Sequence, residues 1–333
     1  MHWLNGWIES SVPLAWVFLG GAFVLLAKSA DMFVESSVSL ANRLRIPRLV
    51  IGIVLVSLAT TAPELSVSLM AAFRGSPEMA MGNAIGSVIC NKALGLSLCA
   101  VLSTAAIPII PHVLKTTGMF FLAISVLIFA FVVFDNTLGR AEGAVLVGLF
   151  SGYMYFIYRQ HRGGAFKEEL DLEAAEEALC MPAQKLTLIF IAALAGILFS
   201  SNIIITSATT IARSFGIPEA LIALTLVALG TSIPEVATCV AAARKGHASL
   251  AVGNILGANI INLCCVAGGS ALINSLLLER KEIMFMFPAM FVIVAVTFGF
   301  MRAGYRLTRR QGYVLLALYG IYIAGFFFVF ALL

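Results

Sequence analysis

The sequence predicts an all-α integral membrane protein with ten transmembrane helices, arranged as two inverted repeats of five helices each. The first observation is composition: of 333 residues, 61% are hydrophobic and only 11% are charged, and the mean hydropathy is +1.01. Soluble domains carry about 25% charged residues, so the lipid bilayer is the expected solvent. The second observation is a series of ten long apolar segments, and the third is an internal repeat at a fixed spacing of 171 residues.

Each of the ten segments is long enough to cross a bilayer, which takes about 20 apolar residues in a helix. They are residues 13–41, 47–73, 78–106, 116–135, 139–158, 184–213, 218–243, 248–277, 283–302 and 311–332. The links are short except for 159–183, where clustered Asp and Glu predict a solvated acidic linker. The chain is therefore expected to divide into a first five-helix repeat at 1–158, a cytoplasmic linker at 159–183, and a second five-helix repeat at 184–333.

The basic residues of the links predict the orientation of the chain. The links on one side of the membrane carry fourteen Lys and Arg residues, and those on the other side carry five. The side with fourteen is expected to face the cytoplasm, which places both termini outside a multi-pass protein of the cell (inner) membrane. The net charge of +4 is spread over the loops and gives no indication of nucleic-acid binding.

The internal repeat relates residues 46–91 to residues 217–262 without gaps. Eighteen of the 46 aligned positions are identical, including a Pro-Glu pair, a Gly-Asn-x-x-Gly pattern and a final Asn. The two motifs extend over 46–96 and 217–267. Because five predicted crossings separate the copies, the second is expected to run through the membrane in the opposite direction. Inverted repeats with interrupted helices near the midplane are typical of secondary transporters.

Each copy places a glutamate directly after a proline in the middle of an apolar segment. These pairs are Pro63 with Glu64 and Pro234 with Glu235. A charged carboxylate is costly in hydrocarbon and proline removes a backbone donor, so both features predict a cavity lined by protein. The carboxylates, the freed carbonyls and the hydroxyls of Thr60, Thr61, Thr231 and Ser232 would make an all-oxygen site, which hard cations such as Ca²⁺ prefer.

The companion segments read GNAIGSVICN at 82–91 and GNILGANIIN at 253–262. Their small-xxx-small glycines predict close approach of helix backbones. The amides of Asn83 and Asn254 are expected to cap helices or to form hydrogen bonds between them. Ser87 and Asn91 lie four residues apart on one helical face.

These motifs resemble the α-repeats of the cation/calcium exchanger superfamily, and most closely those of prokaryotic sodium/calcium exchangers. The family pattern G-[ST]-S-x-P-E corresponds to ATTAPE (59–64) and GTSIPE (230–235), and G-N-x-x-G-S-N-x-x-[ND] corresponds to the companion motifs. The length, the ten segments and the central link also match. The resemblance implies an antiporter that exchanges Ca²⁺ for Na⁺ at a shared midplane site by alternating access. It implies no enzymatic activity and no cofactor beyond the transported ions.

The resemblance also implies a role for ten residues of the chain. Glu64 and Glu235 would be shared by Ca²⁺ and Na⁺. The other ligands would be backbone carbonyls of Thr60 and Thr231 for Ca²⁺, Thr61 and Ser232 for an inner Na⁺ site, Ser87 and the Ala228 carbonyl for an outer Na⁺ site, and Asn91 and Asn262 at the centre.

Five positions depart from the family pattern. Ala258 replaces a serine, Val88 replaces an asparagine, Ala62 and Ala59 replace larger or glycine residues, and Lys92 replaces an apolar residue. Lys92 is turned by about 100° from Asn91 around a helix. Its side chain is therefore expected to face away from the site and to pair with Asp31 or Glu35 of the first segment. If it reached the site instead, it would substitute for a cation and change the stoichiometry or the coupling ion.

Three alternatives remain open. A proton/cation exchanger would use the same site, although proton-coupled relatives usually place an acidic residue where this chain has Asn. A cation channel is disfavoured because channels usually place a ring of subunits around one pore. An intramembrane enzyme is disfavoured because no His base or H-E-x-x-H motif accompanies Ser232 or Glu235.

Overall fold

The computed structural model describes residues 2–44, 46–162, 182–215 and 229–331. The regular secondary structure in this part of the chain is helical apart from four two-residue strands. Eight of its helices are long and apolar enough to cross a bilayer, and one bent helix pair adds a possible ninth span. The prediction of an all-helical membrane protein is therefore confirmed.

The helical spans agree with the predicted segments to within a few residues at each end. They are α2 (Val12–Leu44), the bent pair of α3 (Arg48–Ile51), η1 (Gly52–Val56), α4 (Ser57–Thr60) and α5 (Ala62–Phe73), α6 (Pro77–Cys90) with η2 (Asn91–Gly95) and α7 (Leu96–Leu102), α8 (Pro111–Val113) with η3 (Leu114–Gly118) and α9 (Met119–Asp135), α10 (Arg140–Arg162), α12 (Ala183–Ser214), α15 (Ala248–Ile261) with η4 (Asn262–Ala267) and α16 (Gly268–Ile273), α17 (Arg280–Arg302), and α18 (Arg309–Ala331). Elements marked η are short π-helical stretches inside longer helices.

Two predicted features lie wholly or partly outside the described residues. The seventh predicted segment, 218–243, is described only in its second half, which ends in α14 (Ile233–Arg244). Most of the acidic linker at 159–183 is also outside them.

The structure adds short elements that the sequence does not predict. A helix, α1 (His2–Glu9), precedes the first span. Strand β1 (Ile107–Pro108) pairs antiparallel with β4 (Arg306–Leu307), and β2 (Thr137–Leu138) pairs with β3 (Leu276–Leu277). Each pair joins a link in the first half of the chain to a link in the second half. These pairings satisfy backbone groups at the ends of the helices.

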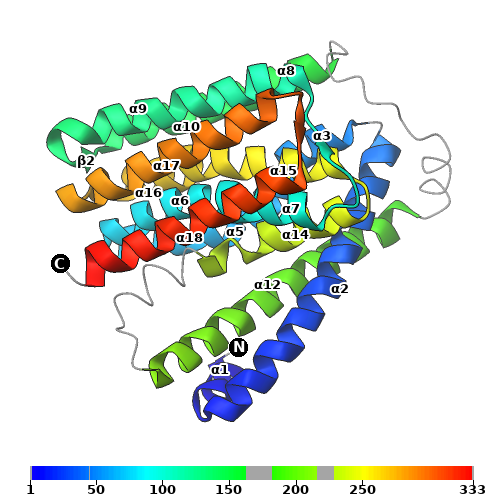
Figure 1. Ribbon diagram of the computed structural model, residues 1–333, viewed down its shortest axis with the longest axis horizontal. Coiled ribbons are helices and arrows are strands. Elements are labelled where there is room, and N and C mark those ends of the chain that lie inside the picture. The colour runs from blue at the N-terminus through cyan, green and yellow to red at the C-terminus, as the bar shows by residue number, and fades with distance from the viewer. Residues whose placement is uncertain (1, 45, 163–181, 216–228, 332–333) are drawn as a thin grey trace.

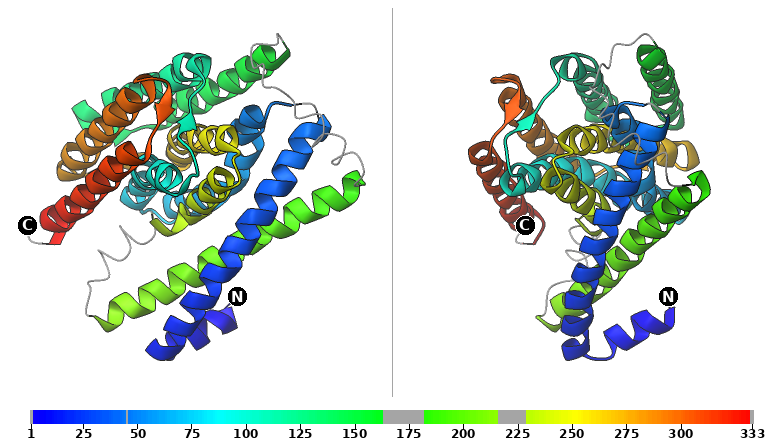
Figure 2. Two further views of the ribbon diagram at one scale, coloured as in Figure 1. Left: turned by 45° about the vertical axis from the view of Figure 1, so that its right-hand side comes forward. Right: turned by 90° about the vertical axis from the view of Figure 1, so that its right-hand side faces the viewer.

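Helices α2 and α12 pack against each other and lie outside the remaining helices (Figures 1 and 2). They occupy corresponding places in the sequence, since α2 begins at residue 12 and α12 begins 171 residues later at residue 183. The same spacing separates α5 from α14 and α6 from α15. Over the described parts of the two repeat motifs, corresponding helices therefore begin at corresponding positions.

The segment from α6 to α7 and the segment from α15 to α16 form the interior of the helix assembly. In the most apolar part of 248–273, 94% of the residues are buried, whereas the corresponding value for α18 is 17%. The peripheral helices carry large apolar side chains on their outer surface, as expected for contact with lipid. Polar residues on the interior helices are consequently shielded from lipid.

Glycines allow α15 to cross the preceding α3–η1 segment at backbone distance. A Cβ added to Gly52 would lie 2.6 Å from the Leu250 carbonyl oxygen, and one added to Gly253 would collide with the Leu49 carbonyl oxygen. The predicted close approach of backbones is confirmed for this glycine of the second motif. This crossing fixes the position of α15 relative to the helix break that follows η1.

Candidate cation site

Two corresponding helix breaks form the framework of the site. Helix α4 ends and α5 begins around Thr61, which has φ −82° and ψ 0°, and Ser232 has nearly the same conformation with φ −83° and ψ −2°. The two parts of the first broken span meet at 46°. Pro63 and Pro234 lie in the first turns of α5 and α14, where a missing N–H is tolerated. Neither proline can donate an amide hydrogen bond to the carbonyl four residues before it, which interrupts the helical bonding at both breaks.

Glu64 and Glu235 lie in the first turns of α5 and α14, and both are fully buried. Each carboxylate accepts a hydrogen bond from a hydroxyl of the opposite motif: Thr61 Oγ1 lies 2.8 Å from Glu235 Oε1, and Ser232 Oγ lies 3.3 Å from Glu64 Oε1. The second oxygen of each carboxylate has no hydrogen-bond partner among the described residues. The arrangement therefore presents two unshared carboxylate oxygens in a buried space, as binding of a cation requires.

The neighbouring hydroxyls also bond across the two motifs. Thr60 Oγ1 lies 3.3 Å from Asn254 Oδ1, and Thr231 Oγ1 lies 3.0 Å from Asn83 Oδ1. The prediction that these asparagines form hydrogen bonds between helices is confirmed. The four hydrogen bonds between the motifs form two symmetric pairs. Each bond from the first motif to the second has a counterpart, 171 residues away, from the second motif to the first.

Three further predicted ligands, Ser87, Asn91 and Asn262, belong to the companion motifs and are buried. Asn91 and Asn262 begin the π-helical stretches η2 and η4, and π-helical turns inside α-helices are frequent at functional sites. The side-chain polar atoms of Ser87, Asn91 and Asn262 are buried and have no hydrogen-bond partner among the described residues. Unpaired buried polar groups are costly and call for an explanation, such as a ligand. Ala228, the tenth predicted site residue, lies outside the described residues.

Among the buried polar residues that were not predicted as ligands but share this property, two lie in the described part of the second repeat motif. The amide of Asn259 in α15 and the hydroxyl of Thr238 in α14 have no hydrogen-bond partner in the described part of the chain. Asn259 could have been found from its place in GNILGANIIN, because it is the motif asparagine whose first-repeat counterpart is Val88. Nothing in the sequence repeat marks Thr238, because the corresponding residue of the first repeat is Val67.

The structure corrects the expected pairing of Lys92. The acidic partners proposed for it instead contact Lys245, whose Nζ lies 2.6 Å from Glu35 Oε1 and 3.9 Å from Asp31 Oδ1. Lys92 is fully buried, and its Nζ lies 4.8 Å from the ring centroid of Phe121 and 5.2 Å from that of Phe298. Because these rings belong to α9 and α17, the side chain faces away from the two carboxylates, as its position on the helix predicts.

Replacing Lys92 with methionine is expected to stabilise the folded protein by about 1–4 kcal/mol. Among the described residues its Nζ has only the aromatic faces as partners, and a desolvated cation–π contact contributes about 2 kcal/mol against a larger cost of burying the charge. Unfolding in detergent micelles measures the difference. The matched control is Leu263→Met at the corresponding buried position of η4, expected to change stability by less than about 1.5 kcal/mol. A less stable Lys92→Met protein would show that the ammonium makes a net favourable interaction.

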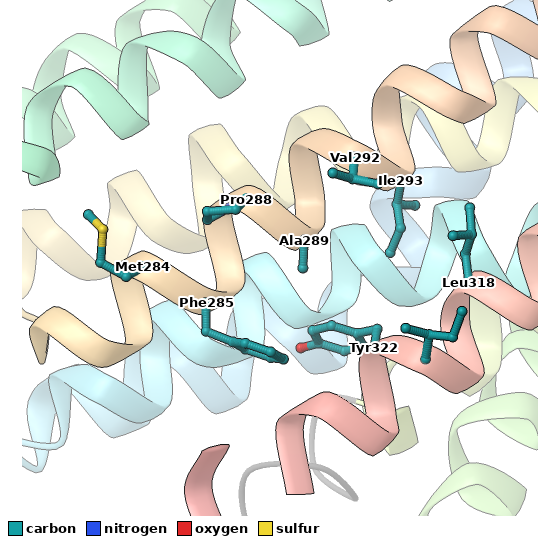
Figure 3. Close-up of a pocket in the computed structure, with 9 residues that line it drawn as sticks. Met284, Phe285, Pro288, Ala289, Val292, Ile293, Leu318 and Tyr322 are labelled. Atoms are coloured by element: carbon teal, nitrogen blue, oxygen red, sulfur yellow. The ribbon is translucent and has the colours of Figure 1, made fainter. Parts of the chain in front are cut away.

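The apolar groove between α17 and α18 does not belong to this site (Figure 3). Its volume is about 310 Å³, and its lining includes Pro288, Val292 and Leu318 together with the rings of Phe285 and Tyr322. The two rings stack with centroids 5.7 Å apart. No carboxylate or amide lines the groove, so its lining lacks the ligands that a hard cation needs.

Comparison with known proteins identifies relatives over nearly the whole chain. The sequence model of the sodium/calcium exchanger protein family matches residues 14–159 and 185–328. The putative antiporter CaxA of Alkalimonas amylolytica is 35% identical over 78% of this chain and 81% of its own length. The sodium/calcium exchanger MaX1 of Methanosarcina acetivorans is 29% identical over 92% of this chain and 96% of its own length. The structure of the sodium-calcium exchanger NCX_Mj superposes with a TM-score of 0.77 at 28% identity, covering 94% of this chain and 99% of that one.

Proposed function

The chain belongs to the sodium/calcium exchanger family, and from that premise we propose that it is an antiporter exchanging Ca²⁺ for Na⁺ at the site between the two helix breaks. The observation that supports this most directly is the pair of buried glutamates. Each carboxylate accepts a hydrogen bond from a hydroxyl of the other motif, and its second oxygen has no hydrogen-bond partner among the described residues. Two carboxylates balance the charge of one Ca²⁺, and oxygen ligands are those that Ca²⁺ and Na⁺ prefer.

We assign the ion ligands to the ten residues given above. Glu64 and Glu235 would bind either ion, so that Ca²⁺ and Na⁺ exclude each other. The hydroxyl, amide and carbonyl oxygens of the remaining residues would complete the coordination: Thr60, Thr61, Ser87, Asn91, Ala228, Thr231, Ser232 and Asn262. An empty site would hold two like charges in a low dielectric, which disfavours crossing without a cation and so couples the two fluxes. No cofactor beyond the transported ions is needed.

Alternating access in this proposal follows from two inverted repeats of five helices, at 1–158 and 184–333, joined by the linker at 159–183. In such a protein the two halves exchange conformations when the site changes sides. An asymmetry between the halves supports this: α2 packs along α14, whereas within the described residues its counterpart α12 does not pack comparably along α5. We further propose that the protein resides in the cell (inner) membrane with both termini outside.

Ion flux into proteoliposomes tests the proposed function. Uptake of ⁴⁵Ca²⁺ is expected when an outward Na⁺ gradient is imposed, and it should stop when Na⁺ is replaced by K⁺ inside the vesicles. Uptake that persists without Na⁺ and follows a pH gradient would assign the chain to proton/cation exchange. Uptake that needs neither gradient would contradict antiport.

Replacing Lys245 with glutamine is expected to lower the population of the conformation seen in the structure by up to about fivefold. Its ion pair with Glu35 connects the end of α14 to α2, and the corresponding residues of the other half, Arg74 and Thr206, cannot form a charged pair. The pair therefore stabilises only one of the two exchanged conformations. Distances between spin labels on α12 and α5 measure the populations.

The matched control for this experiment is Arg74→Gln, at the position of Lys245 in the first half. It should leave the populations unchanged. Equal shifts in both variants would mean that the charge at these helix ends, and not the pair with Glu35, sets the equilibrium.

A further inference from the structure

We propose that Asn83 and Asn254 are positioning residues that hold the ion-binding threonines of the opposite repeat. This inference rests on the proposed function and extends it to residues that do not themselves contact the ion. Asn83 accepts the hydroxyl proton of Thr231 at 3.0 Å, and Asn254 accepts that of Thr60 at 3.3 Å. Both asparagines are buried, so water does not compete for these bonds.

The contacts of Asn83 fix the orientation of its amide. Its Nδ2 donates to the Glu64 carbonyl oxygen at 3.2 Å and to Ser68 Oγ at 2.9 Å. Ser68 in turn directs its own proton to the Ala80 carbonyl at 3.4 Å, so it can only accept from Asn83. With the amide nitrogen facing two acceptors, Oδ1 faces Thr231 and must accept from it. One asparagine thus connects the backbone of α5 to the helix break of the other repeat.

This bond determines what Thr231 offers to an ion. Its hydroxyl proton is used by Asn83, which fixes the side-chain rotamer and with it the backbone at the break. The carbonyl oxygen is then held in one direction before the ion arrives, and a preorganised ligand binds with a smaller entropic cost. The asparagine therefore acts on the ion through the threonine.

The two asparagines are not equivalent. Where Asn83 meets the hydroxyl of Ser68, Asn254 meets the thiol of Cys239, with Nδ2 3.7 Å from Sγ. Sulfur is a weak acceptor. The bond from Thr60 to Asn254 is also longer, at 3.3 Å against 3.0 Å for the bond from Thr231 to Asn83. The second positioning contact is therefore looser, and loss of Asn83 should affect ion binding more than loss of Asn254.

A double-mutant cycle on Ca²⁺ uptake tests the assignment. Asn83→Ala and Thr231→Val are each expected to raise the KM for Ca²⁺ by about tenfold, and the double variant should be no worse than the single ones. The control cycle combines Asn83→Ala with Thr60→Val, which are not partners, and here the two effects should multiply. Multiplying effects in both cycles would overturn the inference, because a merely structural asparagine has no preference for one threonine.

Two further variants keep the test decisive. If Asn83→Ala does not fold, Asn83→Ser preserves an acceptor in a smaller side chain, and the same cycle is measured on it. Cys239→Ser gives Asn254 the acceptor that Asn83 has, and it should lower the KM for Ca²⁺ or leave it unchanged; an increase would contradict the looser-contact argument. If the wild-type protein transports another cation, the proposed function fails, while the cycle measured with that cation still decides the positioning role.

Discussion

Exchanging Glu64 or Glu235 for glutamine is expected to lower Ca²⁺ uptake by at least about 100-fold in folded protein. Glutamine has the shape of glutamate and retains an oxygen that can accept the hydrogen bond from Ser232 or Thr61. What it loses is one of the two negative charges that a buried divalent cation needs, and removing a charged partner inside a low-dielectric site costs about 3–5 kcal/mol. Initial rates of ⁴⁵Ca²⁺ uptake into proteoliposomes measure the loss.

An exposed carboxylate provides the control. Glu9, at the end of α1, lies on the surface, and Glu9→Gln should transport at the wild-type rate. A variant of either buried glutamate that kept normal flux, with an unchanged elution profile in detergent, would contradict the shared-site mechanism. The Glu64→Gln and Glu235→Gln variants should lose transport to a similar degree, because each glutamate accepts a hydrogen bond from the corresponding hydroxyl of the other repeat.

The repeat in the sequence predicted which residues lie at the two helix breaks, but it did not predict the hydrogen bonds between the two repeats. The spacing of 171 residues and the Pro-Glu pairs identified the residues that the structure brings together at two corresponding helix breaks. The partners across the repeats could not be predicted, because the motif places a residue within its own half but says nothing about the register between halves. The bond from Thr61 to Glu235, and not to its neighbour Glu64, depends on that register.

The ion pair between α14 and α2 could not be predicted from the sequence either. Lys92 was expected to pair with Asp31 or Glu35, but the packing of α14 against α2 brings Lys245 to Glu35 instead. The strand pairs β1–β4 and β2–β3 were also missed, because two-residue strands carry no periodicity that a sequence pattern can reveal. The helical spans were predictable because length and hydropathy alone determine them.

Replacing Gly253 with alanine is expected to destabilise the protein by about 2–4 kcal/mol and to abolish exchange with it. The added methyl group would collide with the Leu49 carbonyl oxygen and would lie 3.2 Å from both Gly52 Cα and Ile53 N. These are backbone atoms, so no side-chain rotation can make room, and α15 would have to move away from α3 and η1. That movement would also separate Asn254 from Thr60, because the asparagine directly follows this glycine.

Thermal unfolding in detergent measures the loss, and Gly20→Ala in α2 is the matched control. A Cβ at Gly20 meets nothing within 4 Å. Alanine there should be neutral or stabilising by about 0.5–1 kcal/mol, since glycine weakens a helix interior. If Gly253→Ala unfolded at the same temperature as Gly20→Ala, the backbone crossing would tolerate a methyl group, and the register it imposes on the two repeats would have to come from the cross-repeat hydrogen bonds alone.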